Sequence, residues 1–215
     1  PESRKTVHLP HDAMITEPRS KCLNGANSGY FPGGRYIYEK EFEIAPEQIG
    51  MYIALVFEGV YRCATVFVNG EKLAYHAYGY TEFIVDISKA VNAGINTLMV
   101  DVDNSLEPNS RWYSGSGIYR PVHLVVKPEN HIENVRITTK SISPAVITIT
   151  ADAPAGACVK IFDGDTLVAE GALGDIAVEN AKLWDAENPN LYRAVLTGGG
   201  DTEEVEFGIR QLTWS

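Results

Sequence analysis

The loop between two strand-like runs, residues 96–102 and 122–126, holds the side chains best suited to bind a small molecule. Asp103 and Asn104 begin this loop with a carboxylate and an amide, which together accept and donate hydrogen bonds. Arg111, Trp112 and Tyr113 follow, ahead of a glycine-dense run. Polar and aromatic loops that are held by sheet strands commonly form ligand-contact surfaces. We therefore predict that these five residues contact a substrate.

Local structure offers an alternative explanation for each of these residues. Asp103 and Asn104 are types that are common at strand ends, because their side chains bond to the neighbouring backbone. Trp112 and Tyr113 can stack on a ligand ring or cover a domain interface, and burial with one hydrogen bond is the commoner arrangement for an indole. Arg111 is of a type that often forms structural ion pairs or binds carbonyl groups. The pattern alone leaves both explanations open.

Three other patterns in the chain do not specify a cofactor or a metal. Gly115-x-Gly117 precedes a strand, so it lacks the helix N-terminus that a dinucleotide fingerprint offers to phosphate. Its glycines are expected to permit a tight turn or a bulge. Asp101-x-Asp103-x-Ser105 lacks the glycine of a calcium loop and has Trp112 where a bidentate Glu belongs. His11 is expected to be a structural, hydrogen-bonded histidine. No cofactor is predicted.

Strand periodicity dominates the first 127 residues, which must position the loop. Residues 36–44 alternate bulky apolar with charged side chains, the period of a half-buried strand. Residues 52–57 are more continuously apolar, as in a strand that is covered on both faces. Asn69-Gly70 predicts a hairpin with a type I′ turn between strands at 64–68 and 72–74. Further strands are expected at residues 82–87, 97–102 and 122–126.

The run Pro128-Glu129-Asn130 interrupts this pattern, and we place a domain boundary between residues 127 and 128. Short strands resume beyond it, with Asp163-Gly164 as a second hairpin turn. These strands are expected at residues 132–139, 146–150, 159–162, 166–169, 191–196 and 203–207. The spacing predicts an all-β protein, with a jelly-roll β-sandwich over residues 1–127 and an immunoglobulin-like β-sandwich over residues 128–215.

The composition excludes several classes of partner. Residues 1–127 carry 12 Lys and Arg against 14 Asp and Glu, net −2, and residues 128–215 carry 6 against 14, net −8. An acidic chain without a basic patch is a poor binder of nucleic acid or anionic membranes. No apolar run approaches the roughly 20 residues that span a bilayer. The three cysteines indicate no disulfide framework, which slightly favours a reducing, cytoplasmic location, and Cys63 is expected to be buried.

Several motifs in order along the chain resemble glycoside hydrolase family 2, the β-galactosidases, β-glucuronidases and their relatives. In the first domain these motifs are Leu9-Pro10-His11-Asp12, Gly29-Tyr30-Phe31-Pro32-Gly33-Gly34, Phe67-Val68-Asn69-Gly70, and Arg111-Trp112 with Gly115-Ser116-Gly117-Ile118-Tyr119-Arg120. In the second domain they are Leu183-Trp184, Asn188-Pro189, Leu191-Tyr192 and Phe207-Gly208-Ile209-Arg210. The resemblance spans essentially the whole chain.

The resemblance implies that residues 1–127 are the galactose-binding-like, sugar-binding domain of such an enzyme and that residues 128–215 are its central immunoglobulin-like domain. The catalytic (β/α)₈ barrel, which needs roughly 250 further residues, is not among the 215 residues. Family members cleave glycosidic bonds with two carboxylates, and no pair here can be assigned to those roles. The resemblance also implies that the loop at Asp103 and Asn104 reaches the active site and contacts the sugar.

We therefore expect the N-terminal, non-catalytic part of a retaining, β-galactosidase-like hydrolase, inactive by itself. Its expected partners are a carbohydrate, either a β-galactoside or a related β-glycoside, and the C-terminal catalytic barrel of the same parent chain. A stand-alone carbohydrate-binding module without hydrolase activity is the alternative. An immunoglobulin-like adhesion protein is a third possibility, but it leaves the hydrolase motifs unexplained.

Overall fold

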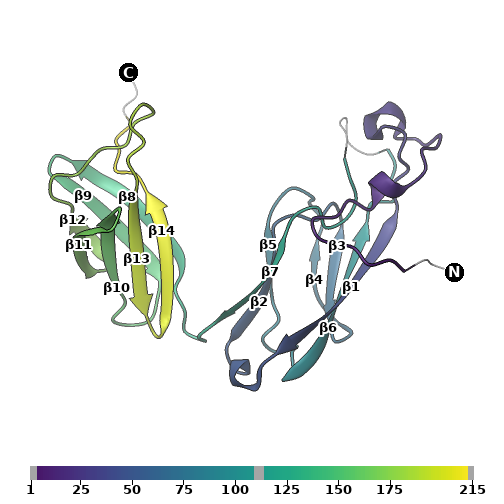
Figure 1. Ribbon diagram of the computed structural model, residues 1–215, viewed down its shortest axis with the longest axis horizontal. Coiled ribbons are helices and arrows are strands. Elements are labelled where there is room, and N and C mark those ends of the chain that lie inside the picture. The colour runs from purple at the N-terminus through teal and green to yellow at the C-terminus, as the bar shows by residue number, and fades with distance from the viewer. Residues whose placement is uncertain (1–3, 109–113, 213–215) are drawn as a thin grey trace. The chain divides into compact units, whose positions relative to one another are not determined.

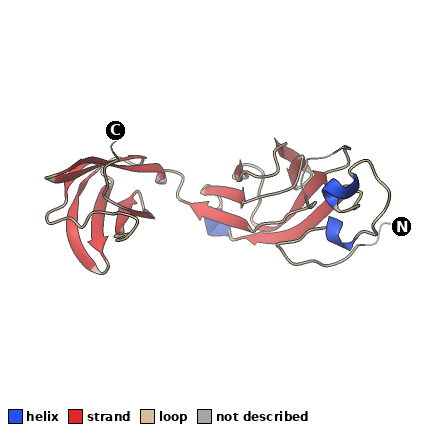
Figure 2. Ribbon diagram, turned by 90° about the horizontal axis from the view of Figure 1, so that it is seen from above, coloured by secondary structure: helices blue, strands red, loops and turns tan. Residues whose placement is uncertain are grey.

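Strands form nearly all of the regular structure (Figures 1 and 2). The computed structural model describes residues 4–108 and 114–212. The chain divides into two compact units, Pro1–Val126 (unit 1) and Lys127–Ser215 (unit 2). The expected fold class is confirmed, since unit 1 is a jelly-roll β-sandwich and unit 2 an immunoglobulin-like one. Among the described residues, no helix has the length and apolar character needed to cross a membrane.

Unit 1 consists of two sheets. The first contains, in spatial order, β1 (Arg35–Ile44), β6 (Gly94–Asp103), β3 (Ala64–Val68) and β4 (Glu71–His76). The second contains β5 (Phe83–Asp86), β2 (Tyr52–Phe57) and β7 (Val122–Lys127). In the described part of unit 1, three short 3₁₀ helices lie between strands or before them: η1 (Met14–Thr16), η2 (Gly25–Ser28) and η3 (Pro46–Gln48).

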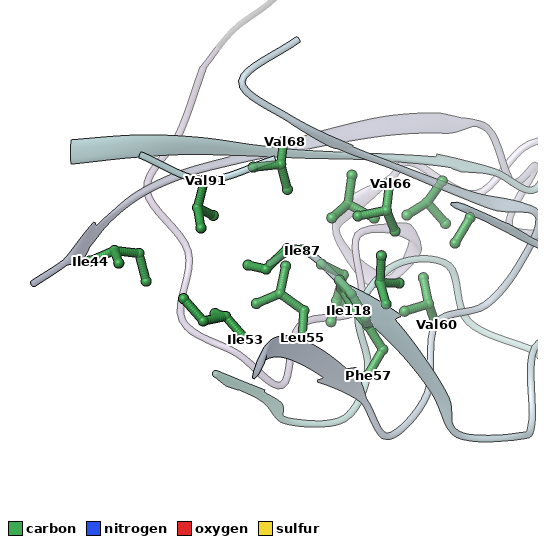
Figure 3. Close-up of a cluster of buried hydrophobic side chains, with 14 residues drawn as sticks. Ile44, Ile53, Leu55, Phe57, Val60, Val66, Val68, Ile87, Val91 and Ile118 are labelled. Carbon is green, nitrogen blue, oxygen red and sulfur yellow. The ribbon is translucent and has the colours of Figure 1, made fainter. Parts of the chain in front are cut away.

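The two sheets of unit 1 enclose an apolar core (Figure 3). Val100 and Val102 of β6 are buried at alternate positions, so Asp101 and Asp103 lie on the opposite face of the same strand. Phe57 of β2 is fully buried and stacks on Phe83 of β5, with ring centroids 4.8 Å apart. Burial of these side chains is the main favourable term in the stability of the unit.

The Asn69-Gly70 hairpin is confirmed. Val68 pairs with Glu71 across it, and the two turn residues have φ values of 51° and 84°, as a type I′ turn requires. β3 is also antiparallel to β6, its neighbour on the other side. β4 and β6 therefore run in the same direction and end at the same edge of the sheet. That edge carries the loop predicted to bind substrate.

Unit 2 is also built from two sheets. The larger contains β11 (Thr166–Ala172), β10 (Cys158–Asp163), β13 (Tyr192–Gly198) and β14 (Asp201–Phe207) in spatial order. The smaller contains β12 (Gly174–Ala177), β9 (Ala145–Asp152) and β8 (Glu133–Ile142). The buried side chains between them include Ile147, Ile161 and Leu196, all fully shielded from solvent.

Two expectations about local structure differ from the fold. β12 was not among the expected strands, since it begins at a glycine and follows a glycine-containing stretch that resembles a loop. Cys63, expected to be buried, is partly exposed and has a φ of 50°, so it ends the preceding loop rather than opening β3. Its backbone N–H donates to the carbonyl of Ala77, 3.3 Å away, which joins that loop to the end of β4.

Candidate functional site

Asp103 lies at the end of β6, on the outer face of its sheet and partly exposed. Its Oδ1 accepts hydrogen bonds from the Ser105 N–H at 3.0 Å and the Ser105 hydroxyl at 2.6 Å. These bonds lower the pKa of the Asp103 carboxyl, and the positive charges of Arg35 and Arg62 lower it further. No described residue donates to Oδ2. The ionised carboxylate is therefore held in place by one oxygen while the other can accept a ligand hydroxyl.

Arg35 and Arg62 flank Asp103. Arg35 pairs with Asp103 across the β1–β6 ladder, and its guanidinium forms an ion pair with the buried Asp101. The carbonyl of Arg62 accepts the Asp103 N–H at 3.1 Å. Arg62 Nε is shielded from solvent and has no hydrogen-bond partner among the described residues. The sequence analysis did not single out either arginine, although the alternation of β1 against β6 could have placed Arg35 there.

Asn104 is almost fully buried, with 1% of its surface exposed. Its side-chain Nδ2 donates to the Ser116 hydroxyl at 2.6 Å and to the Gly115 carbonyl at 3.3 Å. Its backbone N–H donates to the carbonyl of Gly34, 2.8 Å away. Asn104 therefore joins the two ends of the loop to each other and to the start of β1, from inside the unit.

Asp12 fixes the far end of the same loop. Its Oδ1 accepts the backbone N–H groups of Met14 at 3.0 Å and of Ser116 at 2.9 Å. The chain on either side of Asp12 also pairs with the loop, because the Ala13 N–H donates to the Ser116 carbonyl at 2.7 Å. Hydrogen bonds thus join the Leu-Pro-His-Asp motif to the glycine-dense motif, although the two lie about a hundred residues apart in sequence.

The glycines of this motif are required for close packing. A Cβ atom at Gly117 would lie 2.2 Å from the Tyr38 hydroxyl, and one at Gly115 would lie 2.5 Å from the Asp12 carboxylate. Gly117 also has a φ of 126°, and it bridges to Tyr61 with backbone hydrogen bonds of 2.8 and 2.9 Å in the two directions. Close packing at both glycines and the positive φ of Gly117 account for the absence of side chains here, while the expected tight turn or bulge stays a prediction.

His11 is part of the same packing. Its Nδ1 lies 2.9 Å from the Tyr38 hydroxyl, and the two rings meet edge to face. Burial lowers the pKa of His11, as does the nearby charge of Lys5, and burial raises the pKa of Tyr38 to about 12. Both groups are therefore neutral at pH 7. Among the described residues, no three His, Cys, Asp or Glu side chains lie close enough to hold a metal ion.

The structure brings Asp103 and Asn104 together with the glycine motif at one end of unit 1. Arg111, Trp112 and Tyr113 lie outside the described residues, so their predicted contacts stay predictions. The candidate site therefore consists of polar groups that are already fixed in place. Ser105 holds the Asp103 carboxylate, Arg35 and Arg62 lie on either side of it, and the buried side-chain amide of Asn104 joins the two ends of the loop. Such an arrangement suits the recognition of hydroxyl groups rather than covalent chemistry.

Two family models match the chain. The sugar binding domain of glycosyl hydrolases family 2 matches residues 25–128, and a second family 2 model matches residues 122–210. A putative β-glucuronidase of Formosa agariphila is 33% identical over 99% of this chain and 23% of its own length. A β-galactosidase of Bacteroides ovatus is 31% identical over 97% of this chain and 24% of its own length.

Solved structures agree with these sequence matches. A family 2 glycosyl hydrolase from Bacteroides cellulosilyticus superposes with a TM-score of 0.86 at 29% identity, over 98% of this chain and 32% of that structure. The chain spans about a quarter of the length of the curated relatives it matches.

Proposed function

Because this chain belongs to glycoside hydrolase family 2, we propose that it is the non-catalytic, N-terminal part of a hydrolase that cleaves β-glycosidic bonds. The single observation that carries this proposal is the pair of adjoining family matches, which together cover residues 25–210. The named relatives are β-glucuronidases and β-galactosidases. The proposed substrate is therefore a β-galactoside or a related β-glycoside.

In this proposal the catalytic carboxylates come from a C-terminal barrel of the same parent chain. One carboxylate acts as the nucleophile and the other as the acid and base, about 5–5.5 Å apart in a retaining enzyme. The 215 residues supply one wall of the sugar pocket and are inactive by themselves. Unit 2 acts as a spacer in this proposal.

The proposed wall is the loop that begins at Asp103. Asp103 is the residue whose carboxylate accepts hydrogen bonds from sugar hydroxyls, because one of its oxygens has no partner among the described residues. Asn104 is a positioning residue, since its amide is used inside the unit. Arg111, Trp112 and Tyr113 remain proposed sugar contacts on the strength of their types and place in the sequence.

The test uses the full-length protein with nitrophenyl β-galactoside and nitrophenyl β-glucuronide. Asp103→Asn removes the charge of one hydrogen-bond acceptor, so kcat/KM is expected to fall about 10- to 100-fold. Asp86→Asn is a matched control. Asp86 also ends a strand and accepts the N–H and hydroxyl of a serine two residues later, at 2.9 and 2.6 Å, but its strand is β5 of the other sheet.

Equal losses in the two variants would show that Asp103 matters only for its local turn. Wild-type protein that cleaves neither substrate would contradict the proposed hydrolase activity. Turnover by the 215 residues alone would contradict the assignment of catalysis to the barrel.

A stand-alone sugar-binding role is the second candidate, and the match to a sugar binding domain favours it. It predicts measurable affinity of the 215 residues for a monosaccharide. Titration calorimetry with galactose, glucuronate and mannose tests this, and the absence of heat with all three sugars would reject it.

A further inference from the structure

Two tyrosines are exposed on a loop that the rest of the structure holds firmly. Tyr78 and Tyr80 follow β4 and expose 60% and 43% of their surface. Their rings meet edge to face at 5.6 Å, and the Tyr80 ring in turn packs on the buried Tyr61 at 5.3 Å. Large exposed aromatic side chains with fixed neighbours are typical of binding surfaces.

The backbone between these two tyrosines is anchored from several sides. The Tyr119 hydroxyl donates to the Gly79 carbonyl at 2.7 Å. A Cβ atom at Gly79 would lie 2.2 Å from the Tyr61 ring, so the loop packs directly on that ring. After the loop, the Thr81 hydroxyl lies 3.1 Å from His76 Nε2. Because the backbone is fixed before any ligand arrives, binding requires little loss of conformational entropy.

The loop and Asp103 lie along one edge of the sheet. β4 and β6 end at this edge, and β3 lies between them. The Asp103 N–H bonds to Arg62, and the next residue, Cys63, bonds to Ala77, which directly precedes Tyr78. Two interstrand steps separate Asp103 from Ala77, about 10 Å. This backbone separation is comparable to the length of a few linked sugar units, so one oligosaccharide can extend from Asp103 to the tyrosine loop.

We propose that Tyr78 and Tyr80 form a second subsite, at which the apolar face of a sugar ring stacks when the substrate is a β-linked oligosaccharide. The face of a pyranose ring carries C–H groups, and covering them with a tyrosine ring buries apolar area on both sides. The matched sugar binding domain includes both tyrosines and Asp103, which favours a saccharide as the occupant. This inference rests on the proposed function and specifies its substrate as a chain of several sugar units.

The test compares two substrates in the full-length enzyme: nitrophenyl β-galactoside and β-1,4-galactotetraose. If the enzyme cleaves glucuronides instead, nitrophenyl β-glucuronide and a glucuronate-terminated tetrasaccharide replace them. The ratio of kcat/KM for the tetrasaccharide to kcat/KM for the nitrophenyl glycoside is expected to fall about tenfold in Tyr78→Ala and in Tyr80→Ala. It is expected to return to the wild-type value in Tyr78→Phe and Tyr80→Phe, because the ring face is kept.

Ile95→Ala is the control for loss of an exposed apolar side chain. Ile95 is 73% exposed and lies at the opposite end of β6, so its substitution should leave the ratio unchanged. An unchanged ratio in both alanine variants would overturn the second subsite while leaving the proposed hydrolase intact. Equal ratio losses in the alanine and phenylalanine variants would also overturn it, since stacking needs only the ring. Failure of the wild type to cleave any of these substrates would overturn the proposed function, and the subsite with it.

Discussion

Unit 1 and unit 2 are both sandwiches of a four-stranded and a three-stranded sheet, but their interiors differ. Among the described residues, the buried residues with polar or charged side chains all belong to unit 1: Asn24, Ser28, Asn96, Asp101, Asn104 and Ser116. The buried side chains of unit 2 are hydrophobic, and the hydroxyl of one of them, Tyr192, accepts the Lys182 N–H at 2.7 Å. Buried polar groups lower stability unless each is hydrogen-bonded, so a fold that keeps them needs a structural reason to do so.

That reason lies in the loops. In unit 1, Asn104 and Ser116 bond to each other and tie the ends of the loop that begins at Asp103. In unit 2, β13 and β14 are joined by the tight turn Gly199-Gly200, with φ values of 60° and 86°, and the carboxylate of the next residue, Asp201, accepts the Ile132 N–H at 2.8 Å. The comparison indicates that unit 1 uses buried polar side chains to hold the loop of its candidate site, whereas the polar contact beside the turn of unit 2 is only partly buried.

The largest expected effects test what the two units have in common. Phe57→Ala in unit 1 should lower the free energy of unfolding by about 3–5 kcal/mol, and Ile161→Ala in unit 2 by about 2–5 kcal/mol, because each leaves a cavity in a packed core. Hydrogen exchange followed by mass spectrometry would report the loss in the unit that carries the substitution. A loss below about 1 kcal/mol in either would show that its core is not closely packed.

The next effect tests the difference between the units. Asn104→Ala leaves the Ser116 hydroxyl and the Gly115 carbonyl without this donor, and it should destabilise unit 1 by about 1–3 kcal/mol. Asn190→Ala in unit 2 is the matched control, since Asn190 Nδ2 also donates to a carbonyl, that of Leu183, but at an exposed site where water can replace it. Equal losses in denaturant unfolding would contradict the distinction between the two units.

A smaller effect should appear at high pH, in unit 1. Burial raises the pKa of Tyr36 and of Tyr38 to about 12, whereas an unfolded tyrosine has a pKa of about 10. Their contribution to stability is therefore fully present below pH 10 and is lost as the pH rises to 12, because only the unfolded chain ionises readily there. Allowing for solvent screening at these half-buried groups, we expect about 1 kcal/mol for each tyrosine.

Tyr38→Phe should reduce this alkaline loss, as measured by the free energy of urea unfolding between pH 9 and 12. An identical pH dependence in the variant would show that Tyr38 ionises equally easily in the folded and unfolded states.

The smallest expected effect is at a surface ion pair of unit 2. Arg193 and Glu204 lie 3.3 Å apart across β13 and β14, and both side chains are exposed. Glu204→Gln should change the free energy of unfolding by less than about 0.5 kcal/mol, and the change should shrink as salt is added. A loss above about 1 kcal/mol in urea unfolding would indicate that unit 2, too, depends on specific polar contacts.

The hairpin and the strand β1 could be predicted because a few consecutive residues are enough to indicate each of them. Asn69-Gly70 specified a hairpin by its tolerance of positive φ, and the alternation over residues 36–44 specified β1. β12 escaped prediction because it begins at Gly174, shortly after Gly171, so its sequence resembles a loop. The site was predicted less completely. Asp103 ends β6, and its contact with a substrate stays a prediction, while the burial of Asn104 was not predicted.

The sequence by itself determined the all-β class, the hairpin turns and the family, because periodicity, turn residues and ordered motifs are properties of short stretches of chain. Only the tertiary structure decided that Asp12 holds Ser116, that Asn104 points inward and that Tyr78 lies along the same edge as Asp103. Such contacts join residues far apart in sequence, and no local pattern encodes them. They arise when two sheets pack and their edges bring distant loops together.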